Sequence, residues 1–131
     1  MKKLMFSFGA LLFLAACNST SEGELSLNNG QKWVVNAEMK PHLEQSERIL
    51  NDYLTQKGAD YEKLAADLKV QNDQLIKSCT MKGKSHDVLH QWLHPHMALI
   101  ENLSEEKDPK QAASIVEELE QSFKTYQNYF Q

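Results

Sequence analysis

The sequence predicts an all-α protein, an antiparallel up-down-up-down four-helix bundle that follows a signal peptide and a flexible linker. Two observations predict this fold class. From Trp33 onward, apolar residues recur with the period of an α-helix in four segments of roughly twenty residues. Turn and capping residues separate these segments by very short loops, which favours antiparallel neighbours. No segment shows the alternation of apolar and polar residues that is typical of a strand.

The N-terminal residues have the features of a secretory signal. Lys2 and Lys3 precede an apolar run, LMFSFGALLFLAA, that stops directly at Cys17. This run is too short to span a bilayer, and its basic flank is typical of an exported peptide. We therefore expect residues 1–16 to be a signal peptide, and a buried hydrophobic helix is the less favoured alternative.

The stretch LAAC, Leu14-Ala15-Ala16-Cys17, resembles the lipobox of bacterial lipoproteins. In that family the chain is cut before the cysteine, and the cysteine then carries the lipid, which includes palmitate. The resemblance implies a mature protein that begins at Cys17 and is tethered to a membrane of the cell envelope. Asn18 is not the aspartate linked to inner-membrane retention, so the resemblance favours the outer membrane, facing the periplasm.

Three regions are expected along the chain. The signal peptide covers residues 1–16, and residues 17–32, rich in Ser, Asn and Gly, form the lipidated cysteine and a flexible linker. Residues 33–131 are long enough for one bundle with a single core. Loss of the two signal lysines leaves 12 of 14 basic residues against 18 acidic ones, a formal net charge of −6. This charge disfavours nucleic acid as a partner, which leaves the membrane and an envelope protein.

Start and stop residues delimit the first two helices. The first is expected over residues 36–56 and stops at Gly58, with Pro41 either opening it or bending its first turn. The second follows Asp60, a good N-cap, and is expected to end near Gly83.

The third and fourth helices also begin at recognisable caps. Ser85 is the expected N-cap of the third, with Asp87 in its first turn. Pro95 lacks a backbone N–H, so we expect a kink or a brief break there. The fourth begins at DPKQ, residues 108–111, an acidic cap followed by proline at the first helical position.

Potential metal ligands converge at one end of such a bundle. The start of the first helix, the end of the second and the start of the third all lie at that end. The residues placed there have thiol, thioether or imidazole side chains. They are Met39, His42, Cys79, Met81, His86 and His90.

This donor set predicts a site for a soft transition metal. Copper(I) suits cysteine, methionine and histidine together, and zinc suits cysteine and histidine without methionine. We expect Cys79 and His86 as ligands, with one of Met39, Met81, His42 or His90. No ring of carboxylates accompanies them, which disfavours calcium and magnesium.

Three other interpretations remain open. Haem, held by Met39 or His42 with His86, is the rival cofactor, and the absence of a C-x-x-C-H motif excludes covalent haem. A nucleophilic Cys79 with His86 or His90 as its base would make an enzyme, but we expect none. A structural or interaction role without any metal is the third interpretation, in which methionine and cysteine only fill the core.

A polar layer is expected deeper in the bundle. Ser46, Asn72 and His96 lie at the same level on the inward stripes of three helices. Such a layer fixes the register of a bundle, and we prefer this role over a second ligand site. Residues 79–96 are also similar to segments of small helical envelope lipoproteins of Gram-negative bacteria, a similarity that implies no activity.

Overall fold

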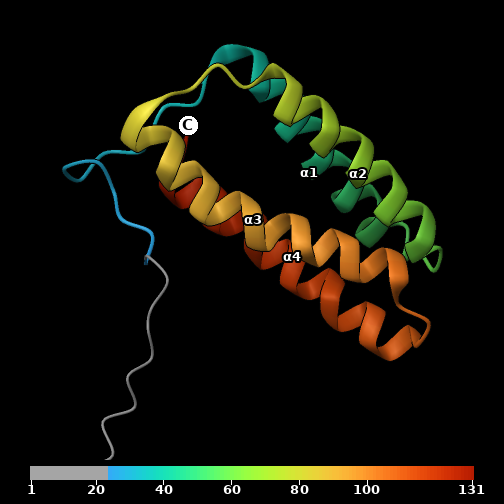
Figure 1. The fold of residues 1–131 in the computed structure, drawn as a ribbon. Helices are drawn as coiled ribbons and strands as arrows, with labels where there is room; N and C mark the ends of the chain where they lie inside the picture. The colour runs from blue at the N-terminus through green and yellow to red at the C-terminus, as the bar shows by residue number, and fades with distance from the viewer. Residues whose placement is uncertain (1–23) are drawn as a thin grey trace, which may run out of the picture.

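The computed structural model describes residues 24–131 and confirms the all-α fold. A short 3-10 helix, η1, precedes the first α-helix, and consecutive helices pack against each other (Figure 1). Among the described residues, no helix is long and apolar enough to cross a membrane. The predicted signal peptide and Cys17 lie outside these residues. The helices are η1 (Ala37–Met39), α1 (Lys40–Thr55), α2 (Tyr61–Ser78), α3 (Gly83–Glu105) and α4 (Pro109–Tyr129).

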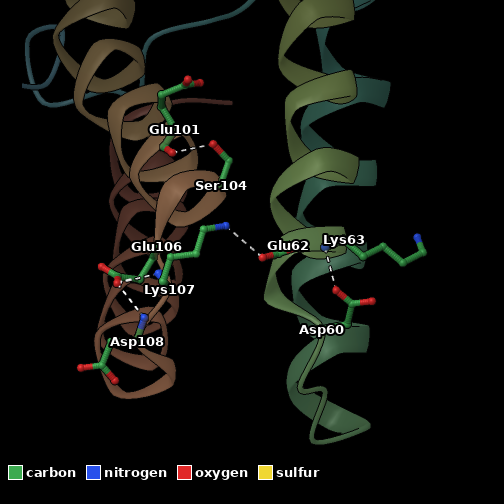
Figure 2. Close-up of polar contacts among 8 residues, drawn as sticks. All are labelled: Asp60, Glu62, Lys63, Glu101, Ser104, Glu106, Lys107 and Asp108. Carbon is green, nitrogen blue, oxygen red and sulfur yellow. Dashed lines mark hydrogen bonds and ion pairs between the residues drawn. The ribbon is translucent and has the colours of Figure 1, made fainter.

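Two of the predicted caps are confirmed at the end of the bundle that holds the α1–α2 and α3–α4 loops. The Asp60 carboxylate accepts a hydrogen bond from the backbone N–H of Lys63 at 2.9 Å (Figure 2). The Asp108 carboxylate accepts one from the backbone N–H of Lys110 at 3.0 Å. Each bond satisfies one of the N–H groups that have no partner within the first turn of a helix.

The predicted boundary between α2 and α3 was wrong. Helix α2 ends at Ser78, before the expected Gly83, and α3 begins at Gly83 with Lys82 as its N-cap residue. Gly83 has φ +67°, a value that glycine adopts without steric cost, so the chain turns into α3 there. The Ser85 hydroxyl donates instead to the carbonyl of Lys82 at 3.3 Å and does not cap the helix.

Pro41 and Pro95 are accommodated without a break. Helix α3 continues through Pro95 from Gly83 to Glu105, so the brief break that was one of the two expected outcomes is absent, and the kink stays a prediction. Pro41 lies in the first turn of α1, where its missing N–H would have no intrahelical partner in any case.

The core consists of two apolar clusters with polar residues between them. Ser46, Asn72 and His96 are the buried polar residues of the described chain, as predicted. In α3, for example, His96 follows Leu93 of one cluster and precedes Ile100 of the other. The site-end cluster comprises Trp33, Val35, Met39, Leu43, Leu75, Val88, Leu89, Trp92, Leu93, Tyr126 and Phe130. The distal cluster comprises Leu50, Leu64, Ala65, Leu68, Ile100, Leu103, Ala112, Val116, Leu119 and Phe123.

Residues 33–35 pair with the C-terminal residues beside the site-end cluster. The backbone N–H of Trp33 donates to Tyr129 O at 2.8 Å, and the N–H of Gln131 donates to Trp33 O at 2.9 Å. The Trp33 indole N–H also donates to Ser26 O at 2.6 Å, and Leu25 packs against the cluster. The later residues of the expected linker therefore lie against the bundle, close to the C-terminus (Figure 1).

Candidate functional site

A hollow of about 460 Å³ lies at the site end, between α2, the α2–α3 connection and α3. Five of the six predicted ligands line it, together with one further histidine and one further methionine. Its lining is Met39, Ile76, Cys79, Met81, His86, Leu89, His90, Leu93, His94 and Met97. A thiol, three thioethers and three imidazoles therefore share one hollow.

His42 is the predicted ligand that does not line the hollow. Its Nδ1 lies 3.4 Å from Oε1 of Gln71, so its ring is turned toward α2. Met39 and Leu43, four residues apart, occupy the buried face of this segment. Residues four apart lie on the same helical face, so Met39 and Leu43 form one inward row. His42, next to Leu43 in the sequence, lies at the edge of that row.

Asn36 holds the chain on both sides of Cys79. Its amide nitrogen donates to Ser78 O at 2.9 Å, and its amide oxygen accepts from the N–H of Thr80 at 3.1 Å. Cys79 has extended backbone angles, φ −71° and ψ 121°, and its thiol is half-buried. A single side chain from the segment before η1 therefore ends α2 and orients Cys79. Sequence reasoning placed Asn36 at the start of a helix and missed this role.

Three histidines form a row along α3. Nε2 of His86 lies 2.9 Å from Nε2 of His90, and Nδ1 of His90 lies 2.8 Å from Nε2 of His94. The rings meet edge to face, with centroids 4.3 and 4.7 Å apart. Because a neutral imidazole has one N–H and one lone pair, His90 donates to one neighbour and accepts from the other.

Sequence reasoning left His94 and Met97 out of the site. The spacing of 86, 90 and 94, four residues at each step, was the available signal, since such residues follow one another along a helix face. Met97 follows His94 by three residues and lies on the same side of α3.

The environment of His90 favours its neutral form. Partial burial lowers the pKa of His90, and the neighbouring His86 and His94 lower it further, against a smaller opposing effect of Asp87. Neutral imidazole is the form that binds a metal, because only it has a free lone pair.

His96 belongs to the polar layer and has a partner that the sequence did not indicate. Its Nδ1 lies 2.8 Å from the hydroxyl oxygen of Ser122 in α4, and its ring stacks on Trp92 with centroids 4.6 Å apart. The Trp92 indole N–H donates to Ser122 O at 2.8 Å. Burial lowers the pKa of His96 to about 4, so this imidazole is neutral at pH 7.

The hollow differs from a metal site built only of His, Cys, Asp and Glu side chains. Within residues 24–131, no three side chains of His, Cys, Asp or Glu are grouped so that they could hold one ion. The thioether sulfurs of Met39, Met81 and Met97 are outside that set of types, and they line the same hollow as Cys79. Comparison with protein-family models, curated proteins and solved structures finds no match to this chain.

Proposed function

We propose that the chain is a non-enzymatic lipoprotein, anchored in the bacterial cell envelope through Cys17, that holds or relays a soft transition metal. One observation carries the metal part of the proposal. The hollow at the site end gathers Cys79, three thioethers and three imidazoles from three segments of the chain: η1, the α2–α3 connection and α3. Thiolate and thioether are soft donors and imidazole is borderline, a combination that suits copper(I).

Copper(I) is preferred over zinc because of the methionines. The proposed ligands are Cys79, His86 and one of Met81, Met39 or His90. Zinc is bound by cysteine, histidine and carboxylates and gains little from thioether sulfur. Leucine at the methionine that serves as the third ligand, in Met81→Leu or Met39→Leu, therefore separates the two ions: a copper(I) site loses affinity, whereas a zinc site does not.

The experiment is a competition for copper(I) between the full chain, purified in detergent under reducing conditions, and a coloured copper(I) chelator. The unaltered chain should hold one tightly bound ion. Cys79→Ser should lower the affinity by at least about tenfold, since even changes to residues behind the ligands cost that much. His42→Asn is the matched control, because His42 lies outside the hollow and should not affect affinity.

Two results would contradict the metal proposal. One is an unaltered chain that does not compete with the chelator for copper(I) or with a zinc indicator for zinc. The other is a Cys79→Ser variant that binds as well as the unaltered chain. The protein would then be an interaction module of the envelope, and the search would turn to its partner.

Haem is the second candidate, because Met39 and His86 line the same hollow. Iron held by one thioether and one imidazole is a common arrangement in cytochromes. Titration of the chain with haem under reducing conditions distinguishes the candidates: a sharp absorption band lost in both Met39→Leu and His86→Ala would favour haem over copper.

The anchor requires a separate test. Cells expressing the full chain are fed labelled palmitate, and the protein is then recovered from inner- and outer-membrane fractions. Incorporation of label into the chain, lost in Cys17→Ser, supports lipidation, and recovery with the outer membrane supports the proposed location. Label retained in Cys17→Ser would contradict the anchor.

A further inference from the structure

The histidine row of α3, His86, His90 and His94, changes in exposure along its length. His94 is exposed, whereas His90 and His86 are half-buried. The central ring, His90, turns Nε2 toward His86 and Nδ1 toward His94. The row therefore offers two pairs of nitrogens, an inner pair between the half-buried His86 and His90 and an outer pair that includes the exposed His94.

The spacing within each pair matches two nitrogens bound to one ion. Zinc–nitrogen bonds are about 2.0–2.1 Å long, so two such ligands at a right angle lie about 2.9 Å apart, and tetrahedral ones about 3.4 Å. In the structure, the two nitrogens are 2.9 Å apart in the inner pair and 2.8 Å apart in the outer pair. Rotation of the exposed His94 ring would exchange the shared proton for an ion with little movement of α3.

The structure points to a second metal position at the outer pair: we infer that Nδ1 of His90 and Nε2 of His94 chelate a divalent ion of borderline character. Its class is zinc, nickel or copper(II), because the protein ligands are two imidazoles and water completes the coordination. This inference extends the proposed function, since the inner, sulfur-containing position of the hollow is a separate one that takes a soft ion.

The two metal positions differ in the softness of their ligands, and this difference affects how firmly each position holds its ion. The inner position retains a soft ion through sulfur, whereas the outer position has no sulfur ligand and exchanges its ion with solvent through His94. When His90 serves as the third copper(I) ligand, the two positions share its ring, and an ion in one position restricts the ring that the other uses. Each ion should therefore weaken the binding of the other, and such coupling is reciprocal.

Nickel(II) is the probe for the outer position, measured by titration calorimetry on the full chain in detergent. The unaltered chain should bind one nickel ion, and His94→Ala should lower that affinity by at least about tenfold. His42→Ala is the matched control, a half-buried histidine outside the row. Circular dichroism of each variant reports whether α3 remains folded.

The reciprocal variant separates this inference from the proposed function. Cys79→Ser should abolish tight copper(I) binding and leave nickel binding intact. His94→Ala should weaken nickel binding and leave copper(I) binding intact. Nickel affinity unchanged in His94→Ala, or equal losses in His94→Ala and His42→Ala, would overturn the outer position. Neither of these results would bear on copper(I) binding at Cys79, so the two proposals fail separately.

Discussion

The two ends of this bundle are stabilised by different kinds of contact. The distal cluster contains mainly aliphatic side chains, and its loops are closed by capping side chains that act on residues two or three positions away. At the site end, the core includes Trp92, Tyr126 and Phe130 in contact with one another, and residues 33–35 pair with the C-terminal residues through backbone hydrogen bonds. The caps of the distal loops are local, although the Lys107–Glu62 ion pair also joins the α3–α4 loop to α2. The segments at the site end are instead joined by hydrogen bonds between residues far apart in the sequence.

This difference matters for the proposed function. A metal site needs ligands from several segments held at a common point, and long-range contacts provide that at the site end. Asn36, for example, acts on residues more than forty positions further along the chain. The Asp60 and Asp108 caps instead act at the opposite end of the bundle from the hollow. We therefore expect changes at the two ends to separate stability from metal binding.

The largest effect is expected from leucine-to-alanine changes that create a cavity at each end of the bundle. Leu68 of the distal cluster and Leu89 of the site-end cluster are both fully buried. Each change to alanine should lower the free energy of unfolding by about 2–5 kcal/mol, because transfer energy is lost and a cavity remains. Only Leu89→Ala should also weaken copper(I) binding, since Leu89 lines the hollow. Urea unfolding followed by circular dichroism, together with the chelator competition, measures both quantities.

A volume-conserving change is the control for this pair. Leu89→Ile keeps the side-chain volume and should cost less than about 1.5 kcal/mol. Equal losses of copper(I) affinity in Leu68→Ala and Leu89→Ala would mean that affinity follows overall stability, and the comparison between the two ends would fail.

The polar layer between the clusters predicts a dependence of stability on pH. Burial lowers the pKa of His96 from 6.5 to about 4, so the unfolded chain takes up a proton at a higher pH than the folded chain does. The stabilising contribution is complete above about pH 6.5 and is lost as the pH falls toward 4. The full change amounts to about 3 kcal/mol.

Urea unfolding at pH 7 and pH 5 tests this prediction. The difference between the two midpoints should shrink in His96→Gln, which keeps a polar side chain but cannot titrate. His42→Gln leaves His96 in place and should retain the full difference. An unchanged pH dependence in His96→Gln would show that other groups cause it.

A smaller effect is expected from Asn36, at the centre of the site end. Asn36→Ala removes both bonds to the chain around Cys79 and should lower the free energy of unfolding by about 1–3 kcal/mol. It should also weaken copper(I) binding, because Cys79 is no longer held in its extended conformation. Asn36→Asp can still accept from the N–H of Thr80 but cannot donate to Ser78 O, so its effect should be intermediate. A variant that loses stability but keeps its affinity would remove Asn36 from the site.

Asn36 also shows which parts of the molecule the sequence could not predict. Helix periods and acidic caps depend on spacing within one segment, and the burial of Ser46, Asn72 and His96 was predicted from the inward stripes of three helices. These predictions are confirmed. The end of α2 depends instead on a bond from Asn36, which no local pattern reveals. The expected helix end at Gly83 was wrong for that reason.

For the candidate site, too, one part could be predicted from the sequence and another could not. The meeting of Met39 with Cys79, Met81, His86 and His90 was predicted from topology alone, and these residues do line one hollow. Whether His42 or Leu43 points inward depends on how the first turns of the helix are rotated about the helix axis. Helical periodicity fixes that rotation only to within about one residue. Metal binding itself remains a prediction, to be tested by the copper(I) and nickel(II) titrations.

The smallest effect is expected at the distal caps, where local contacts dominate. Asp60→Ala leaves the N–H of Lys63 without its side-chain partner and should lower the free energy of unfolding by about 1 kcal/mol. Asp60→Asn should cost much less, because asparagine caps a helix about as well as aspartate. Neither variant should change copper(I) affinity, since this cap lies at the opposite end from the hollow. A loss of affinity in Asp60→Ala without one in Asp60→Asn would show that the distal end contributes to the geometry of the site.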